Sequence, residues 1–220
     1  MLNIKGIIFD LDGTLLDSMW IWGDVAKEYL MKHGKTPRPG LREALRPLNT
    51  TEEAQYYIDE YGIDLPVDEV IKGRDDIMLE LLLTKVKLKT GVIPVLEKLQ
   101  ENGIKMCIAT ATERRLVEPS LDRHDIGKYF ERIFTCTEEN TSKKYPDIYI
   151  RAAEFLGTEA KETMIVEDAL YAMETAKKAG FITAGVYDKV ADDQQKEIKA
   201  LCDHYWITID EMLEYIKQPV

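Results

Sequence analysis

Short apolar runs alternate with helical patterns along most of the chain. The clearest apolar runs cover residues 4–9, 104–109 and 163–166, and each ends just before polar residues. Continuous apolar runs of this length are typical of strands that are covered on both faces, as in a parallel sheet. Residues 133–134 and 184–187 are weaker strand candidates.

Helical patterns lie between these runs, at residues 92–102, 146–156 and 170–179. Each is followed by a glycine, the residue expected just after a helix C-terminus: Gly103, Gly157 and Gly180. Strands and helices in alternation predict an α/β fold, a Rossmann-like parallel sheet with right-handed crossovers and helices on both faces. A capping box at residues 208–211 is expected to open a last helix, which ends near Lys217.

The segment from residue 17 to residue 89 has helical periodicity and no clear strand. Residues 50–53 (Thr-Thr-Glu-Glu) are typical of a capping box that opens a helix running to Tyr61. Residues 67–88 are expected to form one or two amphipathic helices. The sequence therefore predicts a core domain over 1–16 and 90–220, with an all-helical domain inserted over 17–89.

Composition and charge narrow the function classes. The 220 residues contain no run of about 18 apolar residues, which excludes a transmembrane helix, and the N-terminus lacks a signal-peptide layout. Three cysteines without CxxC spacing fit a reducing compartment, with Cys107 in the core, and we expect a cytoplasmic protein. The net charge of −11 argues against nucleic acid or anionic membrane as a partner.

Two carboxylates close the first predicted strand. Asp10 and Asp12 are two residues apart, so both side chains can face one pocket, and Gly13 then lets the backbone turn sharply. One carboxylate can attack phosphorus while the other donates and accepts the proton, because close carboxylates push their pKa values apart. A simple Asx turn is the alternative interpretation.

Residues 7–14 (Ile-Ile-Phe-Asp-Leu-Asp-Gly-Thr) resemble the first motif, hhhDxDGT, of the haloacid dehalogenase-like superfamily of aspartate-nucleophile phosphotransferases. The resemblance extends over the whole chain and is strongest to the phosphoglycolate phosphatase and β-phosphoglucomutase-like group. It implies that Asp10 is the nucleophile and Asp12 the general acid and base. It also implies that small phosphorylated metabolites are the substrates.

The other three family motifs follow in order. The second is matched by Thr110, whose hydroxyl is implied to hold a phosphoryl oxygen together with the Ala111 amide. The third is a lysine three residues before Pro-Asp, which selects Lys143 over Lys144. The fourth is the acidic pair Glu167 and Asp168.

The resemblance implies a Mg²⁺ cofactor. Its ligands would be Asp10, the Asp12 backbone carbonyl, Glu167 and Asp168. The family usually follows the acidic pair with serine and, three residues later, glycine, whereas this chain has Ala169 and Ala172. The missing hydroxyl puts the details of the metal geometry in question.

The helical insert lies where the family carries its helical (C1-type) caps. Arg46 is a candidate for binding a substrate anion, although exposed arginines are more often only solvated. Trp20 and Trp22 are candidates for lining a pocket over the site, while helical amphipathicity favours core packing for at least one of them.

Three functions stay open at this point. Thr14 and the absence of the cap residues associated with β-phosphoglucomutases favour a phosphatase acting on a sugar phosphate, phosphoglycolate or a nucleotide. A phosphomutase would use the same four motifs. A catalytically idle phosphate- or partner-binding protein is supported only by Ala169 and Ala172. Either a monomer or a homodimer fits the sequence.

Overall fold

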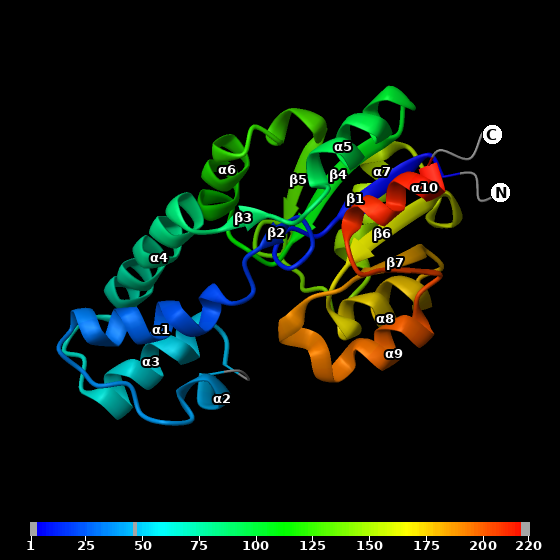
Figure 1. The fold of residues 1–220 in the computed structure, drawn as a ribbon. Coiled ribbons are helices and arrows are strands. Elements are labelled where there is room, and N and C mark those ends of the chain that lie inside the picture. Colours follow the sequence, from blue (N-terminus) through cyan, green and yellow to red (C-terminus); the bar gives the residue numbers. More distant parts are fainter. Residues whose placement is uncertain (1–3, 46–47, 217–220) are drawn as a thin grey trace. The chain divides into compact units, whose positions relative to one another are not determined.

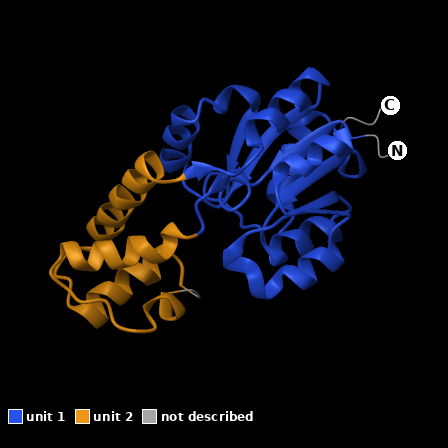
Figure 2. Cartoon of the chain, in the orientation of Figure 1, with its two compact units in different colours: residues 1–19, 87–220 blue, residues 20–86 orange. Residues whose placement is uncertain are grey.

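A computed structural model of the chain describes residues 4–45 and 48–216 (Figure 1). They form two compact units, coloured separately in Figure 2. The core unit consists of Met1–Met19 and Lys87–Val220, and the helical unit of Trp20–Val86. The chain passes between the units after Met19 and after Val86, and each of these points lies three residues from a predicted domain boundary.

The core unit is built on a six-stranded sheet. Its strands are β1 (Gly6–Phe9), β4 (Lys105–Thr110), β5 (Arg132–Thr135), β6 (Thr163–Glu167), β7 (Ile182–Val186) and β8 (His204–Trp206). They lie in the order β5-β4-β1-β6-β7-β8, and every neighbouring pair is parallel. The predicted parallel sheet is confirmed.

Helices flank the sheet on both faces (Figure 1). They are α5 (Val92–Glu101), α6 (Arg114–Arg123), α7 (Asp147–Leu156), α8 (Leu170–Lys178), α9 (Gln195–Leu201) and α10 (Met212–Ile216). Short 3₁₀ turns lie at Gly127–Tyr129, Ala160–Glu162, Lys189–Gln194 and Ile209–Glu211. On one face, Ile8, Cys107 and Ile165 of the three central strands pack in one buried cluster with Tyr149 and Ala152 of α7. Cys107 is buried in the core, as predicted.

The strand order places a topological switch at β1. From β1 the chain builds one side of the sheet through β4 and β5, and then the other side through β6, β7 and β8. The loops that follow β1, β4 and β6 therefore leave neighbouring strands at one edge. In open parallel sheets, this edge is where ligands bind.

The C-terminal part contains elements that the sequence pattern did not predict. Strand β8 and helix α9 extend the sheet and cover it, but each is too short for a clear periodicity. The capping box that was predicted at residues 208–211 is present between Thr208 and Glu211. It opens a 3₁₀ turn that leads into α10, and the predicted helix end near Lys217 lies outside the described residues.

The helical unit contains α1 (Ile21–Lys32), α2 (Leu41–Leu45), α3 (Thr50–Tyr61) and α4 (Val67–Thr84). Tyr29 of α1 and Tyr57 of α3 stack at its centre, with ring centroids 5.5 Å apart. Both rings are buried, so the predicted helical periodicity does mark a packed core.

The prediction that residues 17–89 contain no strand is wrong. Strand β2 (Leu16–Asp17) pairs antiparallel with β3 (Lys87–Leu88). The helical pattern that was extended to residue 88 ends at Thr84. The Lys85 N–H makes the last helical bond, to the Leu81 carbonyl, and the Val86 N–H donates to that same carbonyl, five residues back. Strand pairing then replaces helical hydrogen bonding in the segment that leads back to the core unit.

The N-cap of α3 is Asn49, one residue earlier than predicted. Its Oδ1 accepts hydrogen bonds from the N–H groups of Thr51 and Glu52, each 3.0 Å long. Glu52 Oε2 in turn accepts from the Asn49 N–H at 2.8 Å. Asparagine is among the best N-cap residues, and counting from it places Glu52 at the N3 position that a capping box requires.

Replacing Asn49 with alanine is expected to lower the free energy of unfolding by about 1 kcal/mol, because two helix N–H groups lose their acceptor. Urea unfolding followed by circular dichroism measures this change. Thr50→Ala is the matched control, since Thr50 stands inside the helix and is exposed. Equal losses in the two variants would contradict the assigned cap.

Candidate active site

Three acidic side chains meet at the carboxyl edge of the sheet. Asp10 follows β1, and its N–H donates to the Val166 carbonyl of β6 at 2.9 Å. Glu167 ends β6 and Asp168 follows it. Carboxylate oxygens of Asp10, Glu167 and Asp168 all lie within 4.8 Å of one another, and the three residues are buried. Residues that are far apart in sequence are thus brought together by the strand order.

A buried lysine enters this acidic group from the loop between β5 and α7. The Lys143 ammonium forms ion pairs with Asp10 Oδ1 and with Glu167 Oε1, the latter at 2.7 Å. Its side chain is only 3% exposed, whereas the neighbouring Lys144 is exposed. The lysine that the motif spacing selects is therefore the one that reaches Asp10.

The charges in this group shift one another's pKa values. Burial raises the pKa of Asp10 to about 8, with Lys143 opposing the rise and Glu167 adding to it. Burial likewise raises the pKa of Asp168 well above its ordinary value, and Glu167 and Asp10 add to the effect. Burial alone would lower the pKa of Lys143, but the two carboxylates beside it outweigh burial and hold it well above normal.

Glu167 is held by backbone groups as well as by Lys143. Its Oε2 accepts from the N–H of Asp168 at 2.9 Å and from the N–H of Ala169 at 3.0 Å. Residue 169 thus supports Glu167 through its main chain, so an alanine there keeps this bond. Ala172 is fully buried in α8 and is part of the packing there.

Two hydroxyl groups fix the carboxylate of Asp12. Ser18 Oγ donates to Oδ1 and Thr112 Oγ1 donates to Oδ2, each at 2.6 Å. Both hydroxyl-bearing residues are buried, whereas Asp12 remains partly exposed. The family motifs did not single out Ser18 or Thr112, although Thr112 lies only two residues beyond Thr110.

The turn after Asp10 has no room for a side chain at residue 13. Gly13 has φ of +85°, and a Cβ at this position would lie 2.6 Å from Asp168 Cγ and 2.8 Å from Met19 Cγ. Only glycine allows the first loop to pass this close to the acidic group.

Thr110 ends β4 beside the acidic group. It is buried, and its Oγ1 accepts the N–H of Thr112 at 3.0 Å, so its own hydroxyl proton is available to another acceptor. Ala111 is exposed in the turn that follows. Their expected role toward a phosphoryl oxygen stays a prediction.

The residues that were predicted to act from the cap are not in the core unit. Trp20 and Trp22 each keep 37% of their surface exposed, so the expectation that at least one is core packing is wrong. The guanidinium of Arg74, a buried residue, lies over the Trp22 ring, 5.6 Å from its centroid. Arg46 lies outside the described residues.

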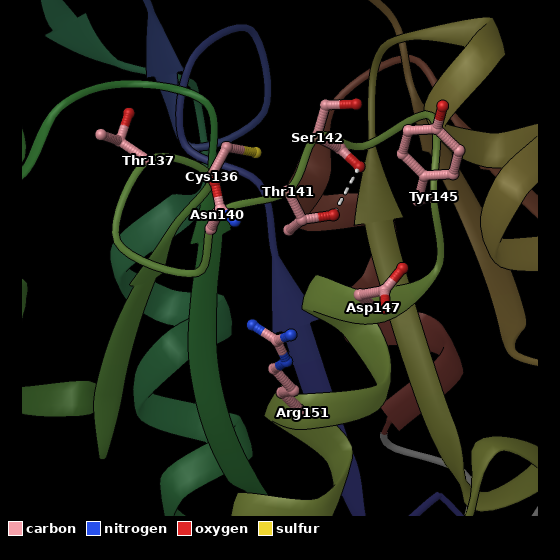
Figure 3. Close-up of a pocket in the computed structure, with 8 residues that line it drawn as sticks. All are labelled: Cys136, Thr137, Asn140, Thr141, Ser142, Tyr145, Asp147 and Arg151. Atoms are coloured by element: carbon pink, nitrogen blue, oxygen red, sulfur yellow. Dashed lines mark hydrogen bonds between the residues drawn. The ribbon is translucent and has the colours of Figure 1, made fainter.

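A pocket of about 550 Å³ lies beside the loop that carries Lys143 (Figure 3). Its lining comes from that loop and from α7: Cys136, Thr137, Asn140, Thr141, Ser142, Tyr145, Asp147 and Arg151. The Arg151 guanidinium is turned to Glu139, with Nη1 donating to its carbonyl at 2.6 Å and to its carboxylate at 2.8 Å. None of the predicted catalytic side chains lines this pocket, so we do not place the active site there.

The acidic group suits a small divalent cation. Mg²⁺ prefers oxygen ligands, and carboxylates are the common protein donors. Among the described residues, Asp10, Glu167 and Asp168 offer three carboxylate oxygens close enough to share one ion. Their combined charge exceeds that of Lys143, so a bound cation would relieve the repulsion among them.

Substituting Thr112 with valine is expected to lower kcat about tenfold, because Asp12 loses one of the two hydroxyl groups that hold it. Steady-state kinetics on the best substrate measures this loss. Thr112→Ser keeps the hydroxyl and is expected to retain most of the activity. A serine variant as slow as the valine variant would indicate a packing role instead.

This arrangement is a Rossmann-like core with a buried acidic group and a lysine at the carboxyl edge of its sheet. The chain belongs to the haloacid dehalogenase-like hydrolase family, because the model of that family matches residues 7–186. The expected family, fold class and enzyme class are thereby confirmed.

Several relatives of the chain are named as phosphatases. The chain is 28% identical over 198 residues to a mitochondrial (DL)-glycerol-3-phosphatase of Arabidopsis thaliana, covering 86% of this chain and 66% of that protein. It is 27% identical over 177 residues to a bifunctional riboflavin kinase/FMN phosphatase of the same plant, covering 79% and 46%. A phosphorylated carbohydrates phosphatase of Thermotoga maritima is 24% identical and is matched over 80% of this chain and 82% of its own. The chain thus spans about two thirds and about half of the two plant proteins.

Solved structures share the fold. CbbY from Rhodobacter sphaeroides, in complex with phosphate, aligns with a TM-score of 0.80 at 19% identity, covering 95% of this chain and 96% of that one. A β-phosphoglucomutase from Clostridium difficile aligns with a TM-score of 0.74 at 18% identity, covering 98% and 96%. No helix within residues 4–45 and 48–216 has the length and apolar character to cross a membrane.

Proposed function

We propose that the chain is a Mg²⁺-dependent phosphatase that hydrolyses a small phosphate monoester through an aspartyl-phosphate on Asp10. The observation that carries the proposal is the buried Lys143 ammonium between Asp10 and Glu167, within a group of three carboxylates. An ion pair this deep, at the ligand-binding edge of the sheet, is suited to an anionic substrate and a cation together.

In the first step, a carboxylate oxygen of Asp10 attacks phosphorus and the bond between phosphorus and the leaving oxygen breaks. Protonated Asp12 donates its proton to that oxygen, which leaves as the alcohol. Ser18 and Thr112 hold Asp12 in a fixed orientation for this transfer. The Lys143 ammonium offsets negative charge at the phosphoryl group.

In the second step, Asp12 takes a proton from water as the water oxygen attacks phosphorus. The bond between phosphorus and Asp10 breaks, which releases phosphate and restores the Asp10 carboxylate. Thr110 and the Ala111 N–H are proposed to hold phosphoryl oxygens in both steps.

Asp10, Glu167 and Asp168 are the residues that would hold Mg²⁺. When bound, the ion supplies positive charge that polarises the phosphoryl group and favours the ionised form of Asp10. This matters because burial otherwise raises the pKa of Asp10 to about 8. We propose the helical unit as a cap that excludes water and selects the substrate.

The test is phosphate release from a panel of monoesters, with Mg²⁺ and with EDTA. The panel includes FMN, glycerol 3-phosphate, phosphoglycolate, sugar phosphates and nucleotides, since the relatives are named for several of these. Release that requires Mg²⁺ and is lost in Asp10→Asn is the expected result. Interconversion of sugar phosphates without release would indicate a phosphomutase, and no reaction of either kind would contradict the proposal.

A further inference from the structure

A second, partly buried ion pair lies at the same edge of the sheet. Lys89 Nζ and Asp188 Oδ2 are 2.9 Å apart, and their side chains are 13% and 6% exposed. Lys89 Nζ also donates to the Tyr187 carbonyl at 2.6 Å, and Asp188 Oδ1 accepts from the Val190 N–H at 2.8 Å. Both partners are therefore fixed in place by further hydrogen bonds.

The pair connects two loops that border the acidic group. The Lys89 N–H donates to the carbonyl of Leu15, one residue after the first motif, at 2.9 Å. Asp188 follows β7, which pairs with β6 so that Gly185 lies opposite Glu167. Asp188 therefore lies at the carboxyl edge of the strand next to the one that ends in Glu167.

Stability alone does not explain this pair. Taking a charged group out of water costs several kcal/mol for each charge. An apolar pair of similar volume would often hold the two loops together equally well or better. Lys87, two residues earlier in the same segment, is exposed instead. The feature that only an ion pair can supply is a fixed positive charge beside Asp188.

We propose that Lys89 is a positioning residue that neutralises and orients Asp188, so that the acidic group keeps an affinity for the phosphate anion as well as for the cation. This inference rests on the proposed function, since it concerns the same site. Without Lys89, Asp188 would add an uncompensated negative charge beside Asp10, Glu167 and Asp168. Such a charge attracts a cation and repels an anion.

The test measures binding of Mg²⁺ alone, and of inorganic phosphate at saturating Mg²⁺, by titration calorimetry on the full chain. Lys89→Met is expected to bind Mg²⁺ about fivefold more tightly and phosphate about fivefold more weakly. Asp188→Asn is expected to shift both affinities in the opposite directions, because it leaves the Lys89 charge in place. In the double variant, both affinities are expected to return to within about twofold of the wild-type values. Lys87→Met is the control, and it is expected to change neither affinity.

A merely structural link between the loops gives a different result. It predicts that Lys89→Met and Asp188→Asn each lower the affinity for both Mg²⁺ and phosphate. It also predicts that the double variant binds these ligands no more tightly than either single variant. That outcome, or unchanged binding in Lys89→Met, would overturn the inference. Should Lys89→Met fail to fold, opposite shifts of the two affinities in Asp188→Asn still decide the matter.

The experiment is independent of turnover. A chain that shows the opposite affinity shifts but hydrolyses no monoester would contradict the proposed function and support the role of Lys89. A chain that hydrolyses monoesters but lacks the opposite shifts would support the proposed function and contradict the role of Lys89.

Discussion

Lys143→Met is expected to reduce turnover by about three orders of magnitude and to lower the free energy of unfolding by about 3 kcal/mol at neutral pH. The first effect follows because the ammonium that contacts Asp10 is the protein's own positive charge at the reacting group. The second follows because Glu167 loses its ion-pair partner in a buried site. Steady-state kinetics and urea unfolding measure the two effects.

Lys144→Met is the matched control, since Lys144 is adjacent, carries the same charge and is exposed. It is expected to keep turnover and stability within about twofold and about 0.5 kcal/mol of the wild type. The comparison separates a charge fixed at Asp10 from the general loss of a positive charge. An active Lys143→Met together with an impaired Lys144→Met would show that the motif spacing had selected the wrong lysine.

The central sheet was predictable because its signal is local. Each inner strand is a short apolar run that ends in a polar residue, as at Asp10, Thr110 and Glu167. A parallel sheet places these ends at one edge, so the strand pattern and the polar residues indicated the candidate site together. Lys143 was found by its spacing to Pro146 and Asp147, although nothing in that spacing shows that the side chain is buried.

What the sequence left out depends on contacts between distant segments. The bond from Thr112 to Asp12 joins residues 100 positions apart, and the bond from Ser18 joins residues 6 apart across the first loop. Serine or threonine at such places is common without any such role. The pairing of Lys89 with Asp188 is of the same kind, since neither residue belongs to a motif. Strand β8 is three residues long, so periodicity could not identify it.

The helical unit shows a different limit. The capping box of α3 was placed one residue late because Thr50 and Asn49 are both good N-cap residues, and only the hydrogen bonds choose between them. Helical periodicity likewise could not show that Trp22 keeps 37% of its surface exposed and contacts Arg74, which lies 52 positions away in the sequence.

Asp10→Asn is expected to make the Mg²⁺-free protein more stable, and increasingly so as the pH rises from about 4 to about 8. In the folded chain, burial raises the pKa of Asp10 from 3.8 to about 8. Over this range the folded state binds a proton that the unfolded state has released. The free energy of unfolding of the wild type therefore falls progressively between the unfolded and the folded pKa, with a slope of at most about 1.4 kcal/mol per pH unit, and falls no further above the folded value.

Asparagine has nearly the shape of protonated aspartic acid but cannot ionise, so the variant escapes this loss. Urea unfolding in EDTA between pH 5 and pH 8 tests the prediction, with Asp122→Asn, an exposed aspartate in α6, as the control. The wild-type curve is expected to fall below that of Asp10→Asn as the pH rises, and added Mg²⁺ is expected to stabilise the wild type more than the variant. Parallel curves would contradict the assigned burial of Asp10. Diverging curves would mean that the acidic site is built at the expense of the stability of the metal-free chain, as expected of a site that is completed by its cation.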